Sequence, residues 1–335
     1  NFDLSVKEYL IFLDNNPNQI RLISDRIMLF PDDHDIIEAI TNLLNESKLI
    51  SAKFILADLQ FKSKKYNDGY ITLKSNNASP SILLEYAQDL ISVNEFLIAE
   101  IILQNVIGST KNEIIITHAI FEIAKIFESK MKTNTHDLPI SGFYSDNSFF
   151  SSPYISVTEQ TSDAMISAME IYDSLRISKN NAQAAYRLAE VQFRVLGDLD
   201  QALYLYKEAH KHGNTQSLRL DAGLGIINIY IAKGDLAIAE NKCNELIVQF
   251  PQKIEYLIKN AQIIFYKGQW GNTNNTLKEI IDKIPNDHWM YNDILNVMSL
   301  LISFRHNQED FIQFANVQLN IQQNNRVEAI EKLEV

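Results

Sequence analysis

Few side chains in this 335-residue sequence are suited to catalysis or metal binding, and they are scattered along it. The densest group is the run PDDHD at residues 31–35, which combines carboxylates with an imidazole, the ligand types of protein metal sites. Asp32 or Asp33, following the helix-terminating Pro31, would also cap and charge the first turn of the next helix. Because the run PNDH at residues 285–288 repeats this arrangement, we interpret both runs as helix starts and expect no metal site.

Two pairs of side chains could support metal binding or acid–base chemistry. His210 and His212 directly precede Gly213, where a cation interacts favourably with a helix C-terminus. His118 and Glu122 stand four residues apart, but such a pair lacks the nucleophile, orienting group and oxyanion donors of a catalytic site. We therefore expect capping and packing roles for these residues.

Cys243 is the sole cysteine, which excludes an intramolecular disulfide and an all-cysteine metal site. Its position in the pattern described below is that of a large buried residue, and this predicts an inert core thiol. The sequence contains no Walker loop, dinucleotide fingerprint or zincin motif. We expect no catalytic residue, no enzymatic activity, no cofactor and no metal.

Composition restricts the partners. With 30 Lys and Arg against 42 Asp and Glu, the net charge of -12 disfavours nucleic acid. The longest apolar stretches, such as residues 294–304, fall short of the roughly 20 residues of a membrane span. The start at Asn1 and the end at Val335 within a helical pattern lead us to expect cut or processed ends. Cytoplasm and bacterial periplasm or envelope both remain open as compartments.

The elements that would position these side chains are helices. Only 10 Gly and 7 Pro occur, too few for the turns of an all-β fold, and 46% of the residues are hydrophobic. The chain exceeds an ordinary single core, so it forms either two domains or one elongated array, and composition favours the array. We predict an all-α protein.

A repeat of helix, turn, helix and stop is visible in the stretch 220–251. Its turn glycine, Gly234, lies 34 residues before Gly268, and its final residue, Pro251, lies 34 residues before Pro285. This spacing matches a known period of helical hairpins. The sequence therefore predicts stacked helical hairpins.

The preceding stretch carries a fuller signature. Its large and small residues occur at the consensus spacings of one repeat family, namely Tyr186, Ala189, Phe193, Gly197, Ala202, Tyr206 and Ala209. This pattern resembles the tetratricopeptide repeat (TPR), and residues 183–216 have some similarity to the related Sel-like repeats. The resemblance implies an α-α superhelix, a solenoid of TPR-like hairpins, with Ala202 and Ala239 where two helices approach closely.

We expect repeats over most of the chain, in two regions. TPR-like hairpins are predicted in residues 1–131, with Gly69 at a close-contact position and Asn94 in place of a turn glycine. A C-terminal TPR array is predicted in residues 159–335, strongest over 183–287. Its end is irregular: residues 289–304 read as one helix, and residues 310–323 begin a further hairpin.

Residues 132–158 interrupt the array. They lack helical periodicity but are rich in serine and aromatic residues, namely Phe143, Tyr144, Phe149, Phe150 and Tyr154. We interpret them as a long insertion loop between two halves of one hairpin, residues 113–130 and 159–177. Loops of this length are usually functional or disordered. The insertion either packs its aromatic rings against neighbouring helices or binds a partner or occludes the groove.

The family resemblance also implies a site. In TPR proteins the first helix of each hairpin lines a concave groove, through its second, fifth, ninth and twelfth positions. These positions correspond here to Arg187, Val191, Arg194, Asp221, Leu224, Asn228, Ile231, Glu255, Ile258, Gln262 and Phe265. The lysine–asparagine clamp that relatives use for a terminal carboxylate is incomplete in every repeat. Amide, aliphatic and aromatic groups suit an extended peptide or an amphipathic helix.

The leading hypothesis is a non-catalytic protein–protein interaction scaffold that organises a multi-protein assembly as part of a larger bacterial repeat protein. One alternative is the regulatory or substrate-recruiting region of an enzyme whose catalytic domain lies outside this segment. The other is a chaperone or secretion adaptor. All three have proteins as partners.

The register of the repeats can be tested at Ala202. We expect Ala202→Trp to unfold its hairpin neighbourhood by overpacking, whereas Gln262→Ala leaves the helicity unchanged. Thermal unfolding followed by circular dichroism measures both. An unchanged thermal stability of the Ala202→Trp variant would contradict the register.

Overall fold

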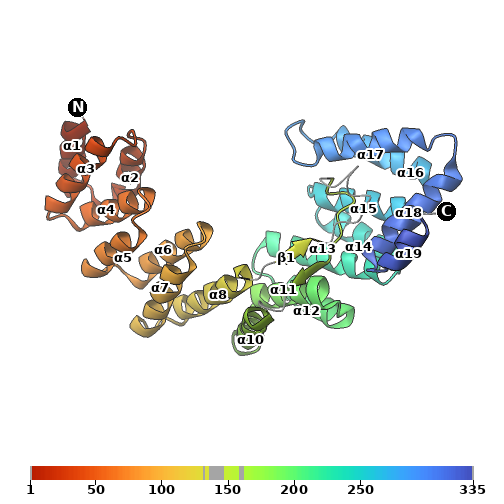
Figure 1. The fold of residues 1–335 in the computed structure, drawn as a ribbon, viewed down its shortest axis with the longest axis horizontal. Coiled ribbons are helices and arrows are strands. Elements are labelled where there is room, and N and C mark those ends of the chain that lie inside the picture. The colour runs from red at the N-terminus through yellow and green to blue at the C-terminus, as the bar shows by residue number, and fades with distance from the viewer. Residues whose placement is uncertain (1, 131–132, 136–146, 158–161, 334–335) are drawn as a thin grey trace. The chain divides into compact units, whose positions relative to one another are not determined.

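A computed structural model describes residues 2–130, 133–135, 147–157 and 162–333. The chain forms two compact units, Asn1–Glu128 and Ser129–Val335. The helices of the first unit are α1 Phe2–Asn15, α2 Ile20–Met28, α3 His34–Glu46, α4 Ile50–Lys62, α5 Tyr66–Ser75, α6 Pro80–Ser92, α7 Phe96–Ser109 and α8 Glu113–Ser129 (Figure 1). A 3₁₀ turn, η1 Pro17–Gln19, precedes α2.

The second unit is also helical, apart from two short strands. Its helices are α10 Ser162–Lys179, α11 Ala182–Val191, α12 Leu199–His212, α13 Gln216–Ala232, α14 Leu236–Gln249, α15 Ile254–Tyr266, α16 Trp270–Ile281, α17 Tyr291–Ser303, α18 Gln308–Gln322 and α19 Arg326–Glu331. A π-helical turn, η3 Gln192–Leu196, extends α11. Strands β1 Thr133–Thr135 and β2 Ile155–Val157 pair antiparallel, with Thr133 opposite Val157.

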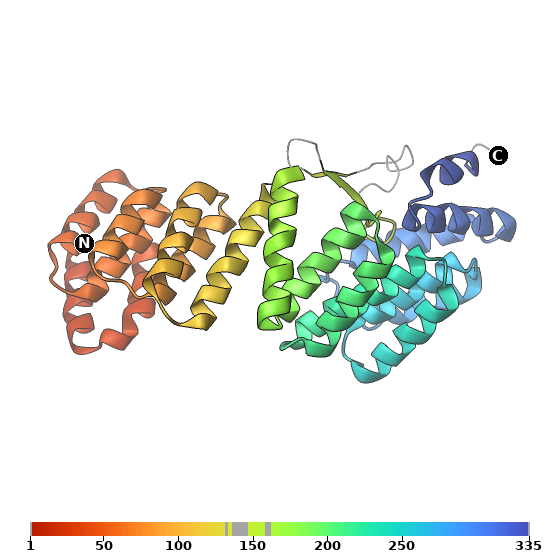
Figure 2. The same ribbon diagram turned by 90° about the horizontal axis from the view of Figure 1, so that it is seen from below.

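Consecutive helices form the predicted hairpins. The pairs α4–α5, α6–α7, α11–α12, α13–α14 and α15–α16 pack against each other, as Figure 2 shows for each unit. Their turns contain a residue with positive φ, namely Lys64 (58°), Asn94 (65°), Gly197 (69°), Gly234 (79°) or Gly268 (69°). Asparagine reaches this left-handed conformation more easily than most residues. The all-α fold of TPR-like hairpins and the turn at Asn94 are therefore confirmed.

Small residues stand where helices approach closely. Ala202 and Ala239 are fully buried. A Cβ at Gly69 would lie 2.2 Å from the Tyr86 hydroxyl oxygen and 3.2 Å from the Ala57 carbonyl oxygen. The absence of a large side chain at these sites lets the second helix of a hairpin lie against its neighbours.

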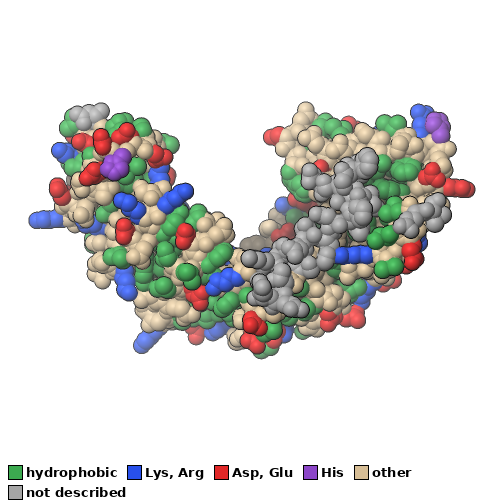
Figure 3. Space-filling view, in the orientation of Figure 1, with side chains coloured by type: hydrophobic (Ala, Val, Ile, Leu, Met, Phe, Trp, Pro, Cys, Tyr) green, Lys and Arg blue, Asp and Glu red, His purple; other side chains and the backbone are tan. Residues whose placement is uncertain are grey.

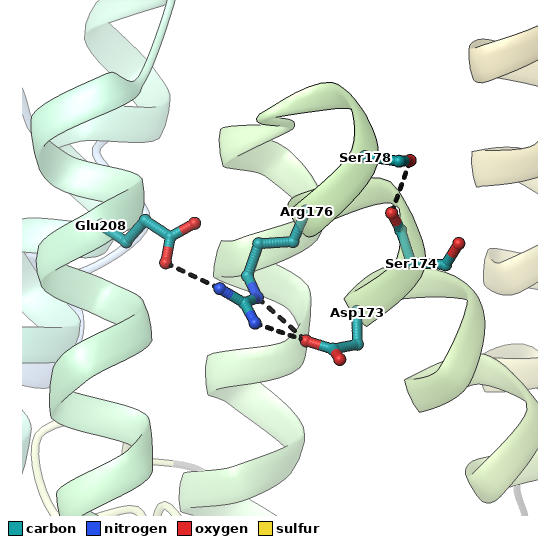
Figure 4. A network of polar contacts seen from close by, with 5 residues as sticks. All are labelled: Asp173, Ser174, Arg176, Ser178 and Glu208. Atoms are coloured by element: carbon teal, nitrogen blue, oxygen red, sulfur yellow. Dashed lines mark hydrogen bonds and ion pairs between the residues drawn. The ribbon is translucent and has the colours of Figure 1, made fainter.

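An ion-pair network ties α10 to the array. The Arg176 guanidinium donates to Asp173 on α10 through Nε (3.0 Å) and Nη2 (2.7 Å), and to Glu208 on α12 through Nη1 (3.1 Å) (Figure 4). The Arg176 side chain is only 16% exposed. Because the fork bridges two helices in a largely desolvated position, it holds α10 against α12 more firmly than a surface ion pair would.

Helix α18 departs from the repeat. It packs against α13 and α15, the first helices of two earlier hairpins, and also pairs with α19. Ile312 on α18 covers the turn at Gly268, where an added Cβ would meet it at 3.0 Å. The irregular end predicted from the sequence is therefore a helix that packs on the wall of the preceding repeats.

The surface of both units carries mixed charge. Figure 3 shows acidic and basic side chains interspersed on the face in view, consistent with a net charge of -12. None of the helices in the described ranges combines the length and apolarity that a membrane crossing requires.

Two glycines test the packing between hairpins. A Cβ at Gly225 on α13 would lie 2.5 Å from the ring of Tyr206. Tyr206 is fully buried, and its hydroxyl donates to Glu190. We expect Gly225→Ala to reduce the free energy of unfolding by about 1–3 kcal/mol, because this clash outweighs the gain in helix propensity. Urea unfolding followed by circular dichroism measures the loss.

Gly271→Ala on α16 is the matched control. No atom lies within 4 Å of its added Cβ, and Gly271 is exposed. Its free energy of unfolding should stay equal or rise by less than about 1 kcal/mol. Equal effects of the two substitutions would contradict the described contact of α13 with α12.

Candidate functional site

The first helices of three hairpins form one wall of a cavity of about 320 Å³ in the second unit. The predicted groove residues Arg194, Asp221, Leu224, Asn228 and Gln262 line it together. The wall also contributes Tyr186, Glu190, Phe193, Gly225 and Lys259. The structure therefore brings together side chains that lie up to 76 residues apart in the sequence.

The other predicted groove residues lie elsewhere. Ile258 and Phe265 on α15 are buried in the hydrophobic core of the unit. Arg187 is half-buried on α11 and is outside the cavity lining. A partner-binding role stays a prediction for Arg187, Arg194, Leu224, Asn228, Ile258, Gln262 and Phe265.

Residues 147–157 of the insertion form the opposite side of the cavity, through Ser148, Ser151, Ser152 and Pro153. Phe143 and Tyr144, which were also predicted as insertion-loop site residues, lie outside the described residues. The chain's own segment thus lies on the wall that the sequence predicted as a groove.

Three side chains that line the cavity, two from the wall and one from α18, donate hydrogen bonds to alternate carbonyl oxygens of this segment. Gln262 Nε2 donates to the Phe149 oxygen (2.9 Å) and Arg194 Nε to the Pro153 oxygen (2.9 Å). Between them, Gln322 Nε2 of α18 donates to the Ser151 oxygen (3.0 Å). These bonds recognise main-chain groups, so they do not depend on the side chains of the bound residues.

Aromatic side chains anchor the segment. The Phe149 ring is fully buried and Phe150 is nearly so, with centroids 5.7 and 5.6 Å from Phe265 in edge-to-face geometry. Tyr154 packs on Phe193 at 5.5 Å and donates its hydroxyl to the Gln322 carbonyl (3.0 Å). Such ring pairs stabilise beyond their buried area.

The start of the segment is fixed on α17. Asn147 Nδ2 donates to the Asp293 carbonyl (3.0 Å), and Ser148 donates to the Asp293 carboxylate through its amide (3.0 Å) and its hydroxyl. The Phe149 amide donates to Asn147 Oδ1 (3.0 Å), which closes a local turn before the extended part.

Arg194 reaches the segment from a distorted helix end. In the π-helical turn η3 the Gly197 amide donates to the Gln192 carbonyl, five residues earlier. Such a bulge inserts one residue and rotates the side chains that follow, and it often marks functional positions. The sequence pattern contains no signal for this bulge.

Polar groups of the wall remain unmatched by the segment. Gln262 Oε1 is buried and has no hydrogen-bond partner in the described part of the chain. Lys259 forms no ion pair with any carboxylate of the described residues. Burial lowers the pKa of Lys259 to about 8, because a desolvated ammonium is disfavoured.

Lys259, Asp293 and Gln322 line or hold the site but were not predicted from the sequence. Lys259 follows a consensus wall position by one residue, and Asp293 and Gln322 belong to α17 and α18, outside the regular repeats. Phe311 and Phe314 could have indicated that α18, the helix of Gln322, packs on the rest of the unit, because aromatic residues three apart on a predicted helix indicate a buried face.

The other candidate chemical groups have structural contacts. Asp33 caps α3 by accepting from the Asp35 amide (3.0 Å), as predicted. Glu122 accepts from Gln88 (2.9 Å) and Lys125 (2.7 Å). Cys243 is fully buried, and burial raises its pKa to about 12, so the thiol carries almost no thiolate at neutral pH.

Comparisons with known proteins gave matches among solved structures alone. No known family model and no curated protein matches this sequence. A tetratricopeptide repeat protein from Parabacteroides merdae ATCC 43184 shares 14% identity, with 90% of this chain and 97% of that chain covered and a TM-score of 0.45. The TPR domain of P58(IPK) shares 13% identity, with 95% and 91% covered and a TM-score of 0.23.

Such scores carry no functional conclusion. The described helices and their left-handed turns, two of which, at Gly234 and Gly268, lie 34 residues apart, define this chain as an all-α repeat protein of TPR-like hairpins.

The bond from Gln262 to the segment can be tested directly. We expect Gln262→Ala to keep the helical circular dichroism but to lower the free energy of unfolding by about 1 kcal/mol, because the buried Phe149 carbonyl loses its donor. Gln313→Ala, exposed on α18, is the control and should change it by less than about 0.5 kcal/mol. Equal values for the two variants in urea titrations would exclude this contact in solution.

Proposed function

We propose that this chain is a non-catalytic protein-interaction scaffold whose C-terminal wall binds an extended segment of a partner protein. One observation carries the proposal: the wall already holds a non-helical segment of the chain, through side-chain bonds to the carbonyl oxygens of residues 149, 151 and 153. Main-chain bonds with pockets for selected side chains are a recurring mode of peptide recognition.

The chemistry of the wall supports a protein ligand over other classes. Two rings of the bound segment insert into an aromatic cluster around Phe265, and such buried aromatic anchors dominate the energetics of protein interfaces. The interspersed surface charges do not favour a polyanion.

The acid Glu190 in the cavity lining has structural contacts. It accepts from the Tyr206 hydroxyl and pairs with Arg194. Two units with separate hydrophobic cores offer more than one surface of stacked hairpins. We therefore also propose that the chain organises a multi-protein assembly.

A peptide supplied in trans tests the wall. We expect a fluorescent peptide with the sequence of residues 147–157, NSFFSSPYISV, to bind the full chain carrying Phe149→Ala, because this substitution loosens the chain's own segment. Fluorescence anisotropy measures the affinity, which we expect in the micromolar range.

Two controls define the contacts. A peptide with alanine in place of its three aromatic residues should not bind, and Phe265→Ala in the chain should abolish binding of the original peptide. Absence of binding at about 1 mM peptide, near the effective concentration of a tethered segment, with an unchanged circular dichroism spectrum, would overturn the proposal.

A further inference from the structure

The chain's own segment fits only part of the wall. Its aromatic rings fill the pocket around Phe265, but its side facing the cavity offers only serine and proline side chains. The Ser151 hydroxyl donates back to the Ser148 carbonyl (3.0 Å), and the Ser152 hydroxyl accepts from the Tyr154 amide (3.3 Å). The hydroxyls of Ser151 and Ser152 are therefore engaged within the segment.

The charged side chains of the cavity differ in whether they have an ionic partner. Glu190 and Arg194 pair with each other (3.4 Å), and Arg194 also binds the Pro153 carbonyl. Asp221 accepts from Ser217 on its own helix at 3.4 Å. Lys259 is a half-buried cation in the same cavity, and it forms no ion pair with a carboxylate of the described residues.

We infer that the partner of this wall is a protein segment with two adjacent aromatic residues and a carboxylate at one of the next two positions, and that it displaces residues 147–157. This inference rests on the proposed function and names its ligand. The aromatic pair would take the places of Phe149 and Phe150, and the carboxylate would stand where Ser151 or Ser152 now borders the cavity.

A partner segment can replace residues 147–157 only if it binds the wall more favourably than they do. A tethered segment competes at an effective concentration in the millimolar range, so a partner needs a contact that the tethered segment lacks. A carboxylate beside Lys259 supplies a charge-assisted bond in a desolvated site, which is stronger than a bond between neutral groups. Burial lowers the pKa of Lys259, so the free wall holds this cation unfavourably and an added carboxylate relieves the penalty.

A double-mutant cycle tests the inference. The probes are the labelled peptide NSFFSSPYISV and the same peptide with aspartate at the position of its sixth residue, the equivalent of Ser152→Asp. In the full chain carrying Phe149→Ala, we expect the acidic peptide to bind about 10-fold more tightly. Adding Lys259→Met should reduce that ratio to about 1 and leave the affinity for the neutral peptide unchanged.

Lys207→Met is the matched control, because it removes an exposed lysine from α12, and it should preserve the ratio. Should Phe149→Ala lose its helical spectrum, Tyr154→Ala loosens the other end of the segment and the same ratios are measured there. The acidic peptide should also bind the unaltered chain more weakly than the loosened one, since the tethered segment competes.

The possible results separate the two proposals. Equal affinities of the two peptides, or a ratio that survives Lys259→Met, would overturn the acidic–aromatic partner and leave the scaffold function standing. Equal affinity for the unaltered and loosened chains would overturn displacement. Failure of both peptides to bind any variant would overturn the proposed function and the inference together.

Discussion

Edge-to-face packing of aromatic rings around Phe265 holds the parts of the C-terminal unit together. The Phe265 centroid lies 5.3 Å from Phe311 on α18, 5.7 Å from Phe149 and 5.6 Å from Phe150. One residue of a regular repeat thereby joins the array, the irregular end of the chain and the insertion. Because interiors are close-packed, none of these three parts can move without exposing the rings of the others.

The same cluster explains why a repeat wall holds a segment of its own chain. Each hairpin buries one face against its neighbours and leaves the other face of its first helix available. In this unit that face combines polar side chains with aromatic ones such as Phe193 and Phe265, and exposed aromatic surface is unfavourable in water. Residues 147–157 of the insertion cover this face. Gln262, Gln322 and Arg194 donate to carbonyl oxygens of the segment that would otherwise be buried without a partner.

The segment buries its own aromatic rings against the wall but leaves polar groups of the wall without partners in the described part of the chain. This difference is the basis for proposing a second ligand. Hydrophobic burial is non-directional, so phenylalanine rings find adequate contacts in many arrangements. Hydrogen bonds and ion pairs need a partner at a defined position. Lys259 lines the cavity without an ion-pair partner among the described residues, so the wall has binding capacity that its own segment does not use.

The hairpins and their register follow from the sequence alone, whereas the occupant of the wall depends on packing between distant segments. Helical periodicity, the turn residues at positions 94, 197, 234 and 268, and the small residues Gly69, Ala202 and Ala239 predict the hairpins, because each acts within one hairpin or on its neighbour. By contrast, the bond from Gln262 to Phe149 spans 113 residues and that from Gln322 to Ser151 spans 171. Residues 147–157 have no periodicity, α18 leaves the repeat, and a π-helical turn re-aims Arg194. Periodicity reports neighbours along one helix, and it therefore carries no information on contacts between segments that are distant in sequence.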